Sequence, residues 1–158
     1  VTLTERHGGD EISPETYDNM VQFVTSLLHD FEAEHNIRDA ILVNKAHLLG
    51  TSGTVTTLAA VHLDLPRYDR SKVDGSWIDV PALEMVAAGL RGMSFEQRAQ
   101  NPCIRRARAD LVVAGCAIMD AITGMWSMER LRVADRGLRE GMLTRMMSAD
   151  RRENAEVL

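Results

Sequence analysis

A run of two glycines and three hydroxyl residues follows an apolar segment and precedes a segment with helical spacing. Its members are Gly50, Thr51, Ser52, Gly53 and Thr54. The free N–H groups at a helix start, with the positive end of the helix dipole, favour a phosphate group. The run has neither the lysine of a Walker A loop nor the spacing of a dinucleotide fingerprint. On this chemistry alone, a phosphate site and a plain tight turn are both open interpretations.

Three arginines, Arg105, Arg106 and Arg108, stand just before the most apolar segment of the chain. The planar guanidinium group suits two-point contact with phosphate. In a chain with a net charge of −5, these side chains form a local positive patch that can meet a polyanion. The alternative interpretation is an ordinary basic turn that faces water.

A second strand-to-helix segment covers residues 135–141, with the sequence Asp-Arg-Gly-Leu-Arg-Glu-Gly. Arg139 and Glu140 are expected in the first turn of the helix that follows. Because a cation near a helix N-terminus is unfavourable, we expect Arg139 to meet a carboxylate or a bound anion. An ion pair with Glu140 or with another element would also satisfy it.

Other hydrolytic chemistries find little support in the sequence. The five histidines show no HExxH or related spacing, and no serine stands in a GxSxG elbow. Zinc hydrolysis and a serine triad are therefore not indicated. Cys103 and Cys116 have no CxxC spacing, and we interpret them as reduced packing thiols of a cytoplasmic protein.

Length and composition predict one α/β domain over residues 1–149, followed by a charged, frayed tail over 150–158. The chain has 158 residues, 45% of them hydrophobic, and a domain of this size buries about two-thirds of its unfolded surface. Its acidic balance argues against a protein that coats nucleic acid. The apolar segment 111–126 is too short and too interrupted to span a membrane, and the N-terminus lacks a signal-peptide pattern.

The first half of the chain predicts the elements that position the glycine-rich run. Residues 1–6 alternate and predict a strand. A Ser-Pro pair at 13–14 starts a long amphipathic helix. Of two short apolar pieces, 40–43 and 47–49, at least the second is expected to be a buried strand. A helix over 54–63 then follows the glycine-rich turn.

The second half predicts a helical layer over the sheet. Residues 66–76 are expected to be irregular, and helices are expected over 80–91 and from Ser94 to just before Pro102. Asp110 is expected to cap the buried helix that follows it.

The chain should end with a strand and one more helix. A strand is expected at 131–133, and Asp135 is expected to cap a last amphipathic helix. The tail over 150–156 is expected to fray. The apolar residues that should face inward on this helix are Leu138, Met142, Leu143, Met146 and Met147.

Four segments in this order resemble the exopolyphosphatase / guanosine pentaphosphate phosphohydrolase (Ppx/GppA) family. They are residues 50–59, residues 68–75, Arg108-Ala109-Asp110 and residues 135–141. The resemblance runs from Val1 to about Met147. It implies the second domain of an actin/Hsp70/sugar kinase (ribonuclease H-like) fold: a small mixed sheet flanked by helices, with the N-terminal strands of the domain partly missing.

The activity that the resemblance implies is hydrolysis of terminal phosphoanhydride bonds in inorganic polyphosphate or guanosine pentaphosphate, with Mg²⁺. The family's catalytic glutamate is expected upstream of Val1, so this chain would hold no catalytic base and would be inactive alone. Its implied partners are the polyanionic substrate, the N-terminal half of the same enzyme and, further, a second protomer. Neither nucleic acid nor a membrane is expected.

The resemblance assigns roles to individual residues. Gly50, Thr51, Ser52, Gly53 and Thr54 match the family's phosphate or nucleotide loop, although Ser52 stands where glycine is more usual. Arg108 matches an arginine that faces the cleft. Asp135, Arg139 and Glu140 match a motif that positions groups near the cleft. Weaker candidates for steering the substrate are Arg67, Arg70 and Lys72.

Two other classes of function stay open at this point. One is a phosphate- or nucleotide-binding module without catalysis, which the lack of a general base favours. The other is an assembly module that packs its long helices on another domain or a second protomer, since methionine is more often core filler than a cofactor ligand.

Overall fold

The protein is described by a computed structural model that covers residues 2–9, 11–43 and 46–156. A three-stranded sheet in the order β1-β3-β2 contains β1 (Leu48–Gly50), β2 (Trp77–Asp79) and β3 (Arg130–Val133). β1 is parallel to β3, and β2 is antiparallel to β3. Because β1 and β3 are parallel, the turns that follow them lie at the same edge of the sheet.

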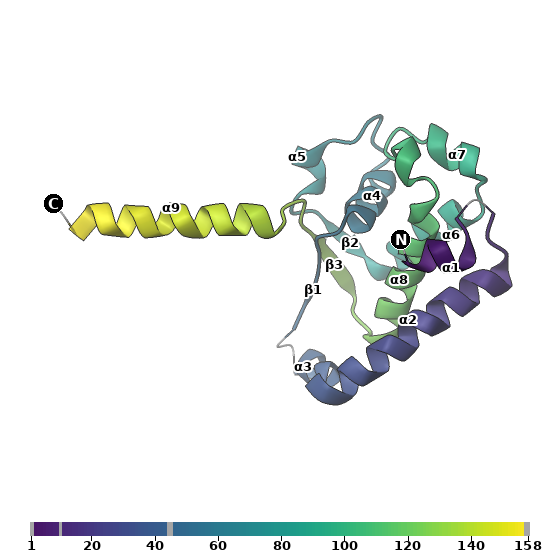
Figure 1. Ribbon diagram of the computed structural model, residues 1–158, viewed down its shortest axis with the longest axis horizontal. Coiled ribbons are helices and arrows are strands. Elements are labelled where there is room, and N and C mark those ends of the chain that lie inside the picture. Colours follow the sequence, from purple (N-terminus) through teal and green to yellow (C-terminus); the bar gives the residue numbers. More distant parts are fainter. Residues whose placement is uncertain (1, 10, 44–45, 157–158) are drawn as a thin grey trace.

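One face of the sheet is apolar and is covered by helices. Along β3, Leu131 and Val133 are buried whereas Arg130 and Arg132 are exposed, as the alternation of side chains along a strand requires. Figure 1 shows the covering helices on one side of the sheet, with α2 outermost and packed along α8. They are α2 (Pro14–His35), α4 (Gly53–His62), α6 (Val80–Arg91) and α8 (Leu111–Met125).

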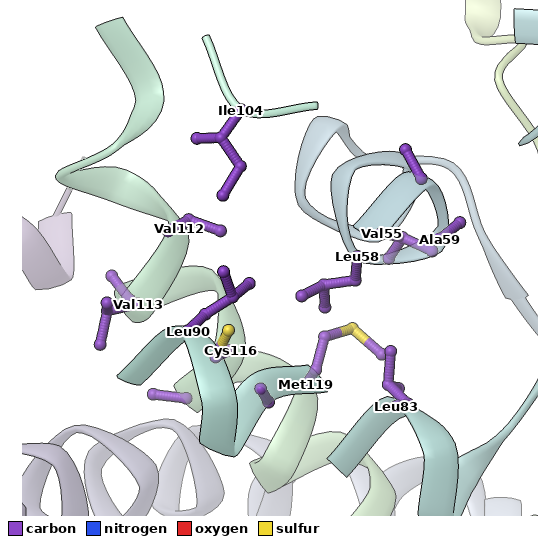
Figure 2. Packing of buried hydrophobic residues seen from close by; sticks show 14 of the residues in the cluster. Val55, Leu58, Ala59, Leu83, Leu90, Ile104, Val112, Val113, Cys116 and Met119 are labelled. Carbon is purple, nitrogen blue, oxygen red and sulfur yellow. The ribbon is translucent and has the colours of Figure 1, made fainter. Parts of the chain in front are cut away.

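The core lies where α4, α6 and α8 meet. Leu58, Leu83, Leu90 and Met119 point into this interior from the three helices (Figure 2). Cys116 is completely buried beside them, and burial raises the pKa of its thiol to about 12. Cys103 is also buried and unpaired by any disulfide, so both cysteines are the packing thiols that their spacing predicts.

Shorter elements link these layers: α1 (Thr2–His7), α3 (Ile37–Leu42), α5 (Arg70–Val73), α7 (Phe95–Gln100) and the 3-10 turn η1 (Arg106–Arg108). Arg98 on α7 is almost fully buried. Its guanidinium donates hydrogen bonds to the backbone carbonyl oxygens of Gly9, Met93 and Ala109. It therefore ties three loops together directly beneath the start of α8.

Most of the expected elements are confirmed. Ser13 caps α2, with Pro14 in its first turn, and Ser94 caps α7 in a reciprocal pair with Gln97. The strand expected at 47–49 is β1, but it is not the buried strand that was expected, since Leu49 is exposed and only Gly50 is buried. Helices α4, α6 and α8 and strand β3 lie where the spacing predicted them. Asp110 occupies the N-cap position of α8, but its side chain makes no capping hydrogen bond to the described residues.

Two expectations are wrong and one open option is decided, because short patterns are ambiguous. The described part of residues 1–6 is helix α1, not a strand, since its buried Leu3 packs against α2 and α8; Val1 lies outside the described residues. The strand option at 40–43 is replaced by the end of α3. Residues 66–76, expected to be irregular, contain α5 and run directly into β2.

The last helix departs furthest from its expected packing. α9 (Leu138–Glu156) projects from the body as a single arm (Figure 1). Its apolar side chains, expected to face inward, are between 56% and 80% exposed. Asp135 is not its cap, because the helix begins three residues later, and the helix continues through Glu156 where fraying was expected. The five exposed residues are Leu138, Met142, Leu143, Met146 and Met147.

Candidate functional site

The turn from β1 into α4 leaves two backbone donors open. Ser52 is the N-cap of α4, and its hydroxyl accepts a hydrogen bond from the Val55 N–H at 3.4 Å. The N–H groups of Gly53 and Thr54 find no acceptor among the residues that the structure describes. At a helix N-terminus such donors favour an anion. The expected loop over residues 50–54 thus has the backbone geometry of an anion site.

Arg108 lies directly against this helix start. A Cβ atom added to Gly53 would collide with its guanidinium nitrogen Nη1, so any larger residue at position 53 would displace the Arg108 side chain. Within the described part of the chain, no carboxylate lies within 4 Å of the Arg108 side chain. The predicted loop and the predicted arginine, 55 positions apart in sequence, are therefore brought together with the positive charge uncompensated.

A second glycine fixes where α4 crosses α8. A Cβ atom added to Gly115 would collide with the side chain of Thr54, so the two helices approach closely at this point. Thr56 and Thr57 donate their hydroxyl protons to the carbonyl oxygen of Gly53, at 3.2 and 2.7 Å. These contacts hold the first turn of α4 in one position.

Two cavities flank Arg108 and share Gly53 and Thr57 in their walls. The Leu111 cavity, of about 250 Å³, is completed by Thr54, Leu111 and Val112. The Tyr68 cavity, of about 410 Å³, is more polar and is lined also by Thr56, Tyr68, Cys103, Arg105 and Asp135. Arg108 is the charged group common to both cavities.

The turn from β3 into α9 carries a network of charged groups around Asp135. Tyr68 donates a hydrogen bond to Asp135 Oδ2 at 2.8 Å, and Arg70 pairs with the same carboxylate and with Glu140. Burial, and then the hydrogen bond to Asp135, raises the pKa of the Tyr68 phenol, so it remains a proton donor. Asp135 and Glu140 both line a further cavity of about 400 Å³ that also includes Thr51, Arg70 and Arg139.

Glu140 closes the start of α9. Its Oε2 accepts a hydrogen bond from the Gly137 N–H at 2.9 Å, and this bond is the main cause that lowers the pKa of its carboxyl. The Arg139 ion pair expected with Glu140 is not formed: Arg70 takes that carboxylate, and Arg139 has no carboxylate within 4 Å in the described chain. Arg139 therefore lines its cavity as an uncompensated cation.

Some residues of the site carried no signal of their own in the sequence. Tyr68 is placed by a tertiary contact with Asp135, and the hydroxyls of Thr56 and Thr57 are placed by bonds within the first turn of α4; the family resemblance pointed to both segments. Of the weaker candidates for steering, Arg70 reaches the site through Asp135. Arg67 and Lys72 are exposed and line none of these three cavities.

The described residues do not fit a magnesium site by themselves. No three His, Cys, Asp or Glu side chains gather into a set that could hold a metal ion in the ranges 2–9, 11–43 and 46–156. The Asp135 carboxylate, which faces the site, is already bonded to Tyr68 and Arg70.

None of the described helices is long and apolar enough to cross a membrane.

The structure is thus an α/β domain with a small mixed sheet, in which an open helix start lies beside an uncompensated arginine. The sequence model of the Ppx/GppA phosphatase family matches residues 1–150, and the chain belongs to this family. The resemblance carried by the four motifs is thereby confirmed. No curated protein matches the chain significantly.

Solved structures show the same fold. A Ppx/GppA phosphatase from Aquifex aeolicus is 24% identical with a TM-score of 0.74, and the match covers 90% of this chain and 45% of that one. For an exopolyphosphatase-like protein the values are 26%, 0.75, 90% and 46%. For an exopolyphosphatase from Cytophaga hutchinsonii they are 21%, 0.74, 89% and 44%. The chain spans about 45% of the length of these relatives, which have the actin-like ATPase fold expected from the sequence.

Proposed function

We propose that this chain is the second domain of a hydrolase that releases terminal phosphate from inorganic polyphosphate or guanosine pentaphosphate. The observation that carries the proposal is the contact of Arg108 with Gly53 at the open start of α4. Family membership supports the phosphatase class. Both substrates end in a phosphoanhydride, so the same grip on a terminal phosphoryl group serves either one.

The part of this domain in the reaction is to bind and orient charge. In the step we propose, water attacks the terminal phosphorus, the bond from phosphorus to the bridging oxygen breaks, and orthophosphate leaves the shortened chain. Phosphoryl transfer depends mainly on positioning and neutralisation of charge. The N–H groups of Gly53 and Thr54 and the guanidinium of Arg108 supply both, and removing one such donor typically costs a hundredfold or more in rate, on the order of 10²–10³.

The general base is proposed to lie in the other half of the enzyme, as the family resemblance implies. Asp135, held by Tyr68 and Arg70, and Glu140, which bonds the Gly137 N–H, act as positioning groups for the neighbouring loop. Magnesium is an expectation from the family, with its ligands outside the described residues. We place the enzyme in the cytoplasm, where free cysteines such as Cys103 and Cys116 are usual.

The proposal is tested by asking whether the chain binds a phosphate chain without hydrolysing it. The purified 158-residue chain is titrated with tripolyphosphate by calorimetry and assayed for released phosphate. We expect binding but no release, and we expect Arg108→Ala to weaken binding about tenfold to a hundredfold, because a charged hydrogen-bond partner is lost. The matched control is Arg106→Ala, since Arg106 pairs with Glu96 at 3.0 Å outside these cavities.

Two results would contradict the proposal. If the chain does not bind tripolyphosphate, or if the two arginine variants bind equally well, the α4 start is not the phosphate site. If the chain alone releases phosphate and Arg108→Ala stops it, the general base lies in this chain.

One observation favours an additional role in assembly. Five large apolar side chains of α9 are exposed, and most of the stability of a helix in a protein comes from packing of its apolar side chains. We propose that the other half of the enzyme covers this helix, with a second protomer as the alternative partner. Light scattering over a range of chain concentrations distinguishes the two, because only the second predicts a mass that rises with concentration.

A further inference from the structure

The three arginines that precede α8 do not have the same surroundings. Arg106 pairs with Glu96 and lies over the ring of Phe95. Arg105 and Arg108 have no carboxylate within 4 Å among the described residues, and both line the Tyr68 cavity. Two uncompensated cations therefore face one cavity, while the arginine between them is engaged elsewhere.

The backbone explains this division. The Arg108 N–H donates a hydrogen bond to the Arg105 carbonyl oxygen at 2.7 Å, which closes a single 3-10 turn. Side chains three positions apart eclipse one another in such a turn. Arg105 and Arg108 consequently fall on one side of the chain and Arg106 on another.

The charges of the cavity favour an anion between the two guanidinium groups. Like charges that share a cavity repel each other, and this repulsion is relieved when an anion enters. The Asp135 carboxylate in the same wall is already bonded to Tyr68 and paired with Arg70. The hydroxyls of Thr56 and Thr57 donate their hydrogen bonds to the Gly53 carbonyl oxygen. The guanidinium groups of Arg105 and Arg108 are therefore the main groups in this cavity that can bind a ligand.

The Leu111 cavity offers no such second charge. Apart from Arg108, it is walled by small, hydroxyl-bearing and apolar residues, including Leu111 and Val112. A phosphate chain bound at the start of α4 and at Arg108 would therefore meet a second positive charge only in the Tyr68 cavity, at Arg105.

We infer that the Tyr68 cavity binds a second phosphoryl group of the same ligand, and that Arg105 is the residue that makes the site prefer linear phosphate chains to orthophosphate. This inference rests on the proposed function, because it takes the first phosphoryl group to lie at Gly53, Thr54 and Arg108. It adds a subsite and a residue that selects for chain length.

The experiment compares orthophosphate with tripolyphosphate on the full 158-residue chain at low, constant ionic strength. Calorimetric titration gives the ratio of the two dissociation constants for the wild type and for Arg105→Ala, Arg106→Ala and Arg108→Ala. Each variant removes one positive charge from the same short segment, so long-range electrostatics are matched. Thermal melting of each variant confirms that it folds.

Arg105→Ala should lower the preference for tripolyphosphate by about tenfold, the usual effect of losing a charge-assisted hydrogen bond, and leave orthophosphate binding unchanged. Arg106→Ala should change neither constant by more than about twofold, as expected for an exposed ion pair. Arg108→Ala should weaken both ligands.

Cys103 lines the Tyr68 cavity, whereas Cys116 is completely buried elsewhere. Because burial raises the pKa of the Cys103 thiol, its slow labelling at alkaline pH gives an independent readout. Tripolyphosphate should slow the labelling of Cys103 by a small thiol reagent, and orthophosphate should not. Labelling of Cys116 serves as the internal control.

The outcomes separate the two levels of the argument. If the wild type binds neither ligand, the proposed function fails and the subsite fails with it. If the wild type binds both but Arg105→Ala keeps the preference for tripolyphosphate, or weakens both ligands equally, the second subsite is wrong and the first stands. If Arg105→Ala and Arg106→Ala lower the preference for tripolyphosphate equally, the preference depends only on net charge and the second subsite is wrong.

Discussion

The turn from β1 into α4 and the turn from β3 into α9 lie side by side, because the two strands are parallel neighbours. The Ala134 N–H even donates to the Gly50 carbonyl oxygen across the gap, at 2.8 Å. At the first turn, the N–H groups of Gly53 and Thr54, beside Arg108, have no acceptor within the described part of the chain. At the second turn, the Glu140 carboxylate bonds the Gly137 N–H and occupies the place that an anion would take.

The difference shows what the fold supplies and what the side chains decide. A parallel strand pair brings two helix starts to one edge of the sheet, and each start attracts negative charge. At α9 the chain provides that charge itself, and at α4 it provides a cation instead. α4 is also fixed by close packing against α8 at Gly115, while α9 projects alone (Figure 1). Only the first turn is both open and rigid.

The largest effect is expected when a methyl group is added at the first turn, at Gly53. Gly53→Ala places a Cβ atom on the Arg108 guanidinium and should displace it, weakening tripolyphosphate binding about tenfold or more. Gly141→Ala on α9 is the control, because nothing lies within 4 Å of its Cβ position. Titration calorimetry of both variants decides the matter, and unchanged binding by Gly53→Ala would show that the close approach is irrelevant to the site.

A second change tests the rigidity of the first turn. Gly115→Ala pushes a methyl group into Thr54, and overpacking of this kind typically costs about 1–3 kcal/mol of unfolding free energy. Gly124→Ala, on the same helix with open space at its Cβ position, should instead stabilise by about 0.5–1 kcal/mol, since alanine is the better helix former. Urea denaturation measures both. Equal stabilities of the two variants would mean that α4 and α8 do not meet closely.

The smallest expected effect concerns the second turn and its pH dependence. The Gly137 N–H lowers the pKa of Glu140 in the folded chain, so its contribution is present above the unfolded pKa and is lost as the pH falls through the folded pKa. Glu140→Gln should therefore reduce stability slightly at neutral pH and flatten its dependence on pH below about 4.5, the ordinary range of a glutamate. Denaturation series at several pH values check this. A variant whose pH profile matches that of the wild type would contradict it.

The sequence predicted best the elements whose signals are local. Ser13 with Pro14, and Ser94 with Gln97, mark helix starts by hydrogen bonds within one turn, and the apolar composition of α8 by itself requires burial. The α4 loop was also found from local chemistry. Arg108 needed the family resemblance, because no local pattern indicates which of three neighbouring arginines faces the loop.

The features that the sequence did not predict depend on contacts between distant residues, which the spacing of apolar residues does not reveal. Six residues at the N-terminus are compatible with a strand or a helix, and the packing of Leu3 decides between them. Tyr68 meets Asp135 across 67 positions of sequence. The apolar residues of α9 predicted an inward face, but a pattern cannot say whether anything lies opposite it.

Arg98 connects the N-terminal residues 2–9, which include α1, to the segment that leads into α8. The guanidinium is almost fully buried, and one of its hydrogen bonds goes to the Gly9 carbonyl oxygen, 89 positions away. Leaving a buried donor without its acceptor typically costs about 1–3 kcal/mol, and more when the donor is charged. Arg98 thereby links Gly9 to Ala109, the residue that follows the turn carrying Arg108. Proteolytic removal of residues 2–9 is therefore expected to loosen the turn that carries Arg108 without altering any residue of the candidate site.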